Sequence, residues 1–234
     1  MKAVYKKELS QLFHSVIGYV YLAVFALVGG LYFTLYNLMP ASGDIRNCFS
    51  PVMSTVIFII PILTMRSYSE ERKMRTDKLL MSAPVSSFAV AVGKELAMLT
   101  VFAVGTAFSL IYVAILARLG SFDGLVVLGN IIGMLVSASA FIAIGMFISA
   151  LTENQIIACI ISYAVLLFLW MIGNADSYIA SPVIASAVSY LSLADRSAEF
   201  SMGILDVSTI IYYLSIAAFF IFLVTAVTEK RRQA

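Results

Sequence analysis

Long uncharged segments are the feature that most constrains how this chain folds. Six segments contain no Asp, Glu, Lys or Arg, namely 9–43, 47–65, 96–117, 124–152, 154–175 and 207–228. A helix that crosses the hydrocarbon core of a bilayer needs about 20 apolar residues, and a charge at its centre costs about 2.5–3.5 kcal/mol. We therefore expect six transmembrane helices, at about 16–38, 50–66, 95–117, 125–151, 155–174 and 207–228.

The composition agrees with a membrane protein. Of the 234 residues, 62% are hydrophobic and 12% are charged, whereas soluble domains carry about 25% charged residues. The six predicted helices occupy most of the chain and leave no room for a separate soluble domain. The sequence thus predicts an all-α membrane protein with a single transmembrane domain over 1–234.

The basic residues fall mostly on one side of the predicted helices. With the N-terminus in the cytosol, twelve Lys and Arg lie in cytosolic segments, and three, Arg46, Arg118 and Arg196, lie in outer loops. Because short cytosolic loops are enriched in Lys and Arg, this distribution predicts a multi-pass protein with both termini in the cytosol. The basic residues follow the membrane topology, so we expect no nucleic-acid partner.

Two segments at the edges of the predicted bundle are less regular. In 1–14, apolar side chains recur at helical spacing between lysines and other polar residues. This pattern indicates an amphipathic interfacial helix, although a plain extension of the first span is an alternative. The long outer segment 174–206 contains an uncharged stretch, 178–193, which Pro182 interrupts. We expect a re-entrant hairpin between the fifth and sixth helices, or a helix packed on the bundle.

The loop between the second and third helices, 67–94, carries an unusual amount of charge. The region 66–95 holds ten of the chain's 28 charged residues. Ser67 to Glu70 has the form of a capping box, and Pro84 ends the helical pattern. We therefore expect a short cytosolic helix over 69–82 with an exposed apolar strip; a solvated loop is the alternative.

Two features of the spans concern packing. Pro61 lies inside the second helix, where a proline removes one backbone hydrogen bond and bends the helix. Gly129, Gly133 and Ser137 follow one another at every fourth position of the fourth helix, and small residues at this spacing let helices approach closely in lipid. We expect a kink at Pro61 and a close helix contact along the small-residue series.

Residue types that support common catalytic chemistry are scarce. His14 is the single histidine, Cys48 and Cys159 lie in different predicted helices and are not expected to pair, and no P-loop motif is present. We therefore expect no metal, no cofactor and no ATP hydrolysis in this chain. The residues EERKMR at 70–75 have the EExxxR form of CAAX-type intramembrane proteases. Those enzymes also need histidines on neighbouring helices, so this interpretation is the weakest.

Several short motifs recur in a fixed order along the chain. They are KEL at 7–9, SVIGY at 15–19, PILTMR at 61–66, ERKMRT at 71–76, LL at 79–80, APV at 83–85, KE at 94–95 and GMFISALTENQ at 145–155. With the six-helix frame, they resemble bacterial ABC-transporter permeases of the export type, and among these the gliding-motility kind. The chain departs from the family pattern at one position, because the family usually has glycine before the threonine, where Arg75 precedes Thr76.

The resemblance implies a permease subunit in the bacterial cytoplasmic membrane that pairs with a second copy or a sister permease. Two separate ATPase subunits, which hold the ATP and Mg, would dock on the 67–86 loop. The residues that the resemblance assigns to this contact are Glu70, Glu71, Arg72, Met74, Arg75, Thr76, Leu79, Leu80 and Pro84, with Glu153 in the turn after the fourth helix. Membrane lipids are further partners, and an extracytoplasmic partner is left open.

The implied function is ATP-driven export. Because no charged residue lies deep in a predicted span, we expect a hydrophobic or amphipathic substrate, with Pro61 in one wall of its path between two permeases. The alternative is a non-transporting membrane scaffold whose charged loop recruits a cytosolic partner.

Overall fold

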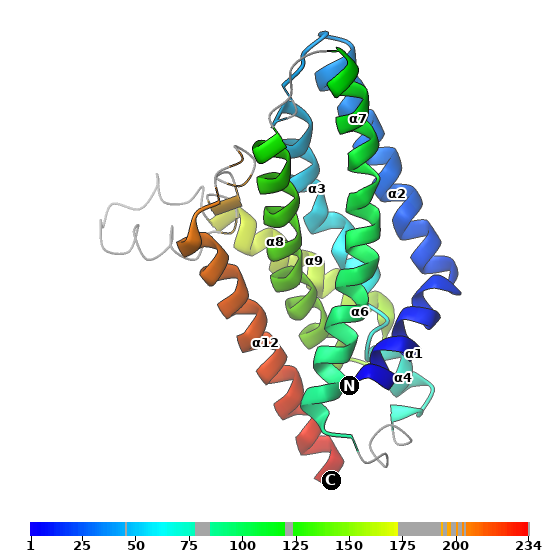
Figure 1. Cartoon of the computed structure of the whole chain (residues 1–234). Coiled ribbons are helices and arrows are strands. Elements are labelled where there is room, and N and C mark those ends of the chain that lie inside the picture. Colours follow the sequence, from blue (N-terminus) through cyan, green and yellow to red (C-terminus); the bar gives the residue numbers. More distant parts are fainter. Residues whose placement is uncertain are drawn as a thin grey trace.

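The computed structural model describes residues 1–44, 46–77, 85–119, 124–172, 193, 196–197, 200, 203 and 205–233. All regular elements among them are helices, which run side by side as an elongated bundle (Figure 1). In chain order they are α1 (Lys2–Phe13), α2 (Val16–Phe33), the π-helix η1 (Thr34–Leu38), α3 (Arg46–Thr64), α4 (Ser69–Lys73), α6 (Ser87–Ala107), α7 (Ser109–Leu119), α8 (Gly124–Leu151), α9 (Gln155–Met171) and α12 (Val207–Gln233).

In the part of the chain that the structure describes, five helical segments are long and apolar enough to cross a membrane: Val16–Leu38, Arg46–Lys73, Ser87–Arg118, Gly124–Leu151 and Val207–Arg232. They correspond to five of the six predicted spans. The remaining predicted span, 155–174, contains the apolar helix α9, whose 17 residues extend about 25 Å at 1.5 Å per residue. The prediction of an all-helical chain with several membrane-length helices is confirmed.

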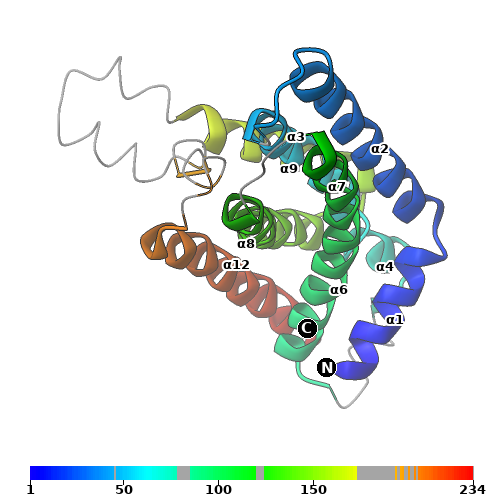
Figure 2. The ribbon, with the colours of Figure 1, turned by 45° about the horizontal axis from the view of Figure 1, so that its top comes forward.

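Helix α1 is a separate element and not an extension of α2. The two meet at a tight corner, where the Ser15 hydroxyl accepts a hydrogen bond from the Gly18 backbone N–H at 3.2 Å. Gly18 must be small, since a Cβ there would lie 2.0 Å from the Leu12 carbonyl oxygen. The corner turns α1 across the bundle, so that it packs mainly on α6 (Figure 2).

Helix α8 is the central helix of the bundle and is buried along most of its length. It contacts α12, α3, α6 and α9. Gly145 marks its closest approach to α3, because a Cβ at this position would lie 2.2 Å from the Thr64 hydroxyl. Cβ atoms at Gly129 and Gly133 would lie 2.8 Å from the Gly203 carbonyl oxygen and 2.4 Å from the Phe200 ring, respectively.

The small-residue series therefore faces Phe200 and Gly203 of the same chain. Its third member, Ser137, donates to the Gly133 carbonyl at 2.8 Å within α8 and also contacts the Met53 sulfur of α3 at 3.7 Å. Pro61 lies within α3 and is buried inside the bundle.

The third span begins earlier than the sequence predicts. We expected its start at about 95, within the charged pair Lys94 and Glu95, but α6 begins at Ser87, with the Ser86 hydroxyl accepting from the Ala89 N–H at 3.3 Å. Lys94 and Glu95 both lie inside this helix and are buried, with 1% and 4% of their surfaces exposed. The uncharged segment did not mark the start of this helix correctly, because protein groups enclose the two charges of Lys94 and Glu95.

Both chain termini lie at the same end of the bundle, close to α4 (Figures 1 and 2). We call this the charged end. The predicted re-entrant hairpin at 178–193 lies outside the described residues except for Leu193, whose carbonyl accepts from the buried Tyr213 hydroxyl of α12 at 2.8 Å.

Candidate functional site

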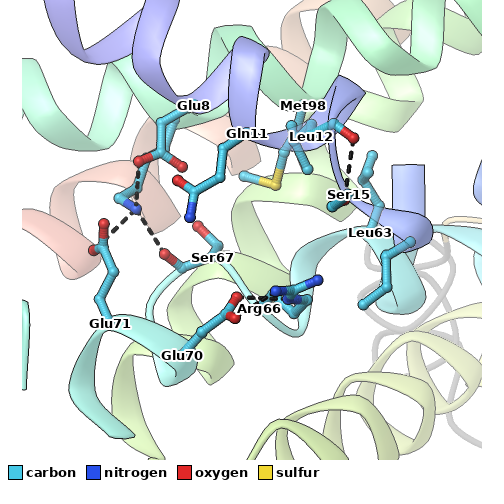
Figure 3. Close-up of a pocket in the computed structure, with 12 residues that line it drawn as sticks. Glu8, Gln11, Leu12, Ser15, Leu63, Arg66, Ser67, Glu70, Glu71 and Met98 are labelled. Carbon is cyan, nitrogen blue, oxygen red and sulfur yellow. Dashed lines mark hydrogen bonds and ion pairs between the residues drawn. The ribbon is translucent and has the colours of Figure 1, made fainter. Parts of the chain in front are cut away.

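A buried lysine organises the charged end of the bundle. All three N–H groups of the Lys94 ammonium have acceptors: Glu8 of α1 at 3.1 Å, Glu71 of α4 at 3.0 Å and the Ser67 carbonyl at 2.7 Å. Figure 3 shows Glu8, Glu71 and Ser67, which come from separate parts of the chain, with dashed lines that converge on one nitrogen atom. It also lies 4.9 Å from the centre of the Tyr68 ring, within cation–π range.

A second lysine balances the two carboxylates. Lys7 contacts Glu71 at 2.9 Å and Glu8 at 3.2 Å, so two cations face two anions in what we call the lysine–glutamate cluster (Lys7, Glu8, Glu71, Lys94). Partial burial lowers the pKa of Lys7, but the hydrogen bond and charge of Glu71, with those of Glu8, outweigh this effect and raise it overall. The cluster joins α1, α4 and α6 by charge-assisted contacts.

A serine of α8 holds the other side of the same segment. The Ser149 hydroxyl accepts hydrogen bonds from the backbone N–H groups of Tyr68 and Ser69, each at 3.1 Å, and donates to the Met65 carbonyl at 3.0 Å. The predicted capping box is therefore wrong. Tyr68 is the N-cap residue of α4, and the Ser67 hydroxyl is buried without a hydrogen bond to any described residue. Ser149 satisfies N–H groups that a capping side chain would otherwise bind.

Two further ion pairs fix α4. Arg72 contacts Glu153, in the turn after α8, at 2.7 Å. Arg66 forms an ion pair with Glu70, four residues later. With the cluster and Ser149, these contacts connect the segment 65–73 to α1, α6 and the end of α8.

Helix α4 covers only the first part of the helix predicted over 69–82, and residues 78–82 lie outside the described residues. Helix α4 ends at Lys73, because Arg75 adopts a left-handed backbone conformation with φ 56°. The Thr76 N–H donates to the Glu71 carbonyl at 2.9 Å and the Arg75 N–H donates to the Arg72 carbonyl at 3.0 Å. This is the pair of bonds of a Schellman motif, which usually has glycine at the left-handed position.

The predicted contact residues separate into two groups. Glu70, Glu71 and Arg72 are half-buried and engaged in ion pairs within the chain, so they do not form an open charged surface as expected. The exposed part of the segment is 73–76, and Met74 in it is 68% exposed. We call 73–76 the exposed tip. Leu79, Leu80 and Pro84 lie outside the described residues.

Two pockets flank α4. The first, the charged pocket, holds about 520 Å³ of empty space between α1, α6 and the end of α3, and is shown in Figure 3. The second, the basic pocket, holds about 510 Å³ and lies between α4, the start of α6 and the end of α12. Its cationic lining residues are Arg72, Arg231 and Arg232.

Several important residues were not among those predicted for the site. Lys94 and Ser149 occur in the quoted motifs, but nothing in the sequence showed that they meet. Glu95 is also buried, and neither of its carboxyl oxygens has a hydrogen-bond partner among the described residues. The described residues contain no group of three or more His, Cys, Asp or Glu that could hold a metal ion.

No protein-family model matches the chain, and no curated protein matches it. Function is therefore inferred from the residues and their geometry.

Proposed function

We propose that this chain is the membrane-spanning permease subunit of an ATP-driven ABC transporter of the bacterial export type. In this proposal α9 is the fifth of six spans, both termini and the charged end lie in the cytosol, and α4 is the start of the coupling element. The observation that carries the proposal is the construction of 65–76, which is tied to the bundle on one side and exposed on the other.

The ties make 65–73 a rigid extension of several helices. Lys94 links it to α6 and, through Glu8, to α1; Ser149 and Glu153 link it to the end of α8. A loop that served only to set membrane topology would need charge but no such contacts. Because packed elements transmit displacement through contiguous contacts, a force on the tip would move the cytosolic ends of three helices together.

The exposed tip supplies the docking chemistry. Met74 presents a flexible apolar side chain between Lys73 and Arg75, all exposed. An apolar contact flanked by cations suits an acidic-rimmed cleft on a partner protein. The partners are two ATPase subunits, which bind the ATP and Mg, and the second permease would enclose the path of a hydrophobic or amphipathic substrate.

Docking is tested by co-expression with a candidate P-loop ATPase, which is to be sought among the genes beside this one. Met74→Glu places a charge on the tip and is expected to abolish co-purification of the ATPase. Met39→Glu is the matched control, because Met39 is 75% exposed on the turn after η1. Equal capture by both variants would exclude the tip as the docking surface.

Coupling is tested separately from docking. Glu153→Gln and Ser149→Ala weaken the contacts between α4 and the end of α8 but leave the exposed tip unchanged. Both variants are therefore expected to bind the ATPase, but the reconstituted permease should no longer stimulate ATPase turnover. Ser139→Ala is the control on α8, since its hydroxyl bonds only within its own helix at 2.7 Å. If the ATPase binds and its turnover is the same with and without the permease, the chain is a scaffold and not a transport subunit.

A further inference from the structure

The buried carboxyl group of Glu95 has no part in the proposed coupling role. Glu95 lies in α6 with 4% of its surface exposed, and both of its carboxyl oxygens are buried without a hydrogen-bond partner among the described residues. Its neighbour Lys94 directs all three N–H groups to other acceptors. A buried carboxylate without a cation or a donor is costly, so burial favours the neutral, protonated form of this group.

The ion pairs of the charged end are complete without Glu95. The lysine–glutamate cluster contains two ammonium groups and two carboxylates, so its charges already balance. Arg66 is paired with Glu70, and Arg72 with Glu153. An ionised Glu95 would therefore add a negative charge to a region in which these cations already have their anions.

Tyr68 shows where this additional charge would act. Three carboxyl groups, those of Glu71, Glu8 and Glu95, lie within electrostatic range of the Tyr68 side chain. The ring of Tyr68 also lies 4.9 Å from the Lys94 ammonium. Glu95 thus shares the environment of the cluster, and a charge on it would oppose the two carboxylates that hold α1 and α4 against α6.

The elements packed on α6 were searched for other groups that could compensate Glu95. Helices α2 and α8 contain no charged residue, and α7 has its single charge in its last turn. Helix α1 contributes the cluster and Tyr5, whose hydroxyl bonds with Thr100, while its lysines outside the cluster are exposed. The charged end of α12 meets the start of α6, where Ser87 donates to Glu229, about two turns before Glu95.

We propose that Glu95 is a proton-binding site that makes the attachment of α1 and α4 to α6 depend on pH. With the proton bound, the charged end keeps the contacts described above. When the carboxyl group releases its proton to water, a carboxylate remains that the surrounding protein does not pair. This charge is stabilised only when the contacts around Tyr68 open and admit water.

Stability as a function of pH provides the first test, on the purified full-length chain in detergent. Glu95→Gln keeps the shape of the protonated side chain and cannot ionise. A glutamate in the unfolded chain ionises near pH ~4.3, whereas the folded chain keeps the proton, so the stability of the original chain falls as the pH rises. The advantage of Glu95→Gln is expected to grow between about pH 5 and 8, by up to about tenfold in the unfolding equilibrium constant per pH unit. A constant difference overturns the proposal.

A matched variant and a direct readout distinguish this site from the other carboxylates. Glu70→Gln removes a carboxylate that is paired with Arg66, and it should give no advantage that grows with pH. Infrared spectra at neutral pH should show the carbonyl band of a protonated carboxylic acid in the original chain and in Glu70→Gln, but not in Glu95→Gln. Absence of this band from the original chain also overturns the proposal.

Opening of the charged end is tested by cysteine labelling without the two native cysteines. Val4 is 6% exposed and faces α6, since a Cβ at Gly93 would lie 3.2 Å from its side chain, whereas Ala3 is exposed. The ratio of the maleimide reaction rates of Val4→Cys and Ala3→Cys corrects for the ionisation of the thiol itself. This ratio is expected to rise with pH and to stay constant when Glu95→Gln is added. The same rise in both backgrounds would exclude Glu95 as the switch.

Discussion

A lysine with 1% of its surface exposed has exchanged water for protein groups at every N–H. For Lys94 the exchange is complete, since two carboxylates and one carbonyl accept hydrogen bonds from its three N–H groups. The effect of losing a charge from this cluster depends on which residue is removed. Removing Lys94 leaves Glu8 and Glu71 facing each other with Lys7 as their single counter-charge. Removing a charge at the exposed edge of the cluster, such as Lys7, leaves partners that water can still reach.

The first prediction concerns this asymmetry. Lys94→Met is expected to destabilise the fold by roughly 3–5 kcal/mol, because it leaves uncompensated charge in a partly buried site. Adding Glu71→Gln should recover part of the loss by restoring a balance between Lys7 and Glu8. Thermal unfolding in detergent measures both, with exposed Lys6→Met as the control. If Lys94→Met unfolds no earlier than Lys6→Met, the cluster does not stabilise the fold.

The left-handed residue after α4 gives the second prediction. Arg75→Gly should increase stability by up to about 1 kcal/mol, since glycine adopts this conformation without steric cost. Lys73→Gly, two residues earlier and inside the helix, should decrease stability by about 1 kcal/mol. The opposite signs, measured by unfolding the two variants side by side, constitute the test; a loss at both positions would contradict a Schellman turn at Arg75.

Which single residues matter could be predicted from the sequence only in part. The left-handed turn at Arg75 was not predicted, because the helical pattern expected over 69–82 continues through this position. Lys94 could not be assigned to the site, since Glu8 and Glu71 lie 86 and 23 residues before it in the sequence. Ser149 could not be assigned either, since Tyr68 and Ser69 lie about 80 residues before it. A single sequence contains no direct signal for such contacts.

Among the elements, α8 supports the α4 segment through one hydroxyl, which yields the third prediction. Ser149→Ala removes three hydrogen bonds and leaves two backbone N–H groups without their acceptor, so we expect a loss of about 2–3 kcal/mol. Ser139→Ala breaks only one bond within the helix and should cost less than about 1 kcal/mol. Hydrogen exchange at 68 and 69 should accelerate in the first variant alone; unchanged exchange there would contradict the role of Ser149.

The close approach of α8 to α3 gives the fourth prediction. Gly145→Ala would place a Cβ 2.2 Å from the Thr64 hydroxyl and is expected to cost about 1–3 kcal/mol through overpacking. Gly30→Ala is the control, because the nearest atom to its Cβ is 3.6 Å away; alanine should be tolerated or stabilising there. Adding Thr64→Ala to Gly145→Ala should recover part of the loss. Additive effects in a double-mutant cycle would argue against a contact between the two residues.

The elements themselves were largely predictable, and the failures have physical causes. Uncharged segments located five membrane-length helices because a charge in lipid is costly. The same rule placed the start of α6 eight residues too late in the sequence. Lys94 and Glu95 lie inside this helix, where neighbouring helices and not water surround their charges. The helix over 69–82 was predicted without a break at Arg75, because helical periodicity gives no sign that this residue turns left-handed.

For the whole molecule, the fifth prediction concerns topology. Both termini lie at the charged end, and Met39 lies on the turn that follows η1. In a background without Cys48 and Cys159, Met39→Cys should react with a membrane-impermeant maleimide in intact cells, and Lys73→Cys should react only after lysis. Both positions are exposed, so the difference reports sidedness. Reaction of Lys73→Cys in intact cells would invert the proposed orientation.

The general architecture followed from composition, while the relation between its parts did not. The count of basic residues predicts which end faces the cytosol, and the helical pattern predicts the number of elements. Neither predicts that α1 lies across α6, since this depends on the corner at Gly18 and on the lysine–glutamate cluster. Such long-range contacts are fixed only when the helices are assembled.

The position of Lys94 along the chain also orders the events of biosynthesis. Ribosomes add Glu8 and Glu71 to the chain before Lys94, so the nascent chain holds the two carboxylate acceptors before their ammonium donor has been made. Until α6 has been synthesised and inserted, α1 lacks the helix on which it mainly packs. The final position of α1 therefore depends on a helix that is made much later than α1 itself.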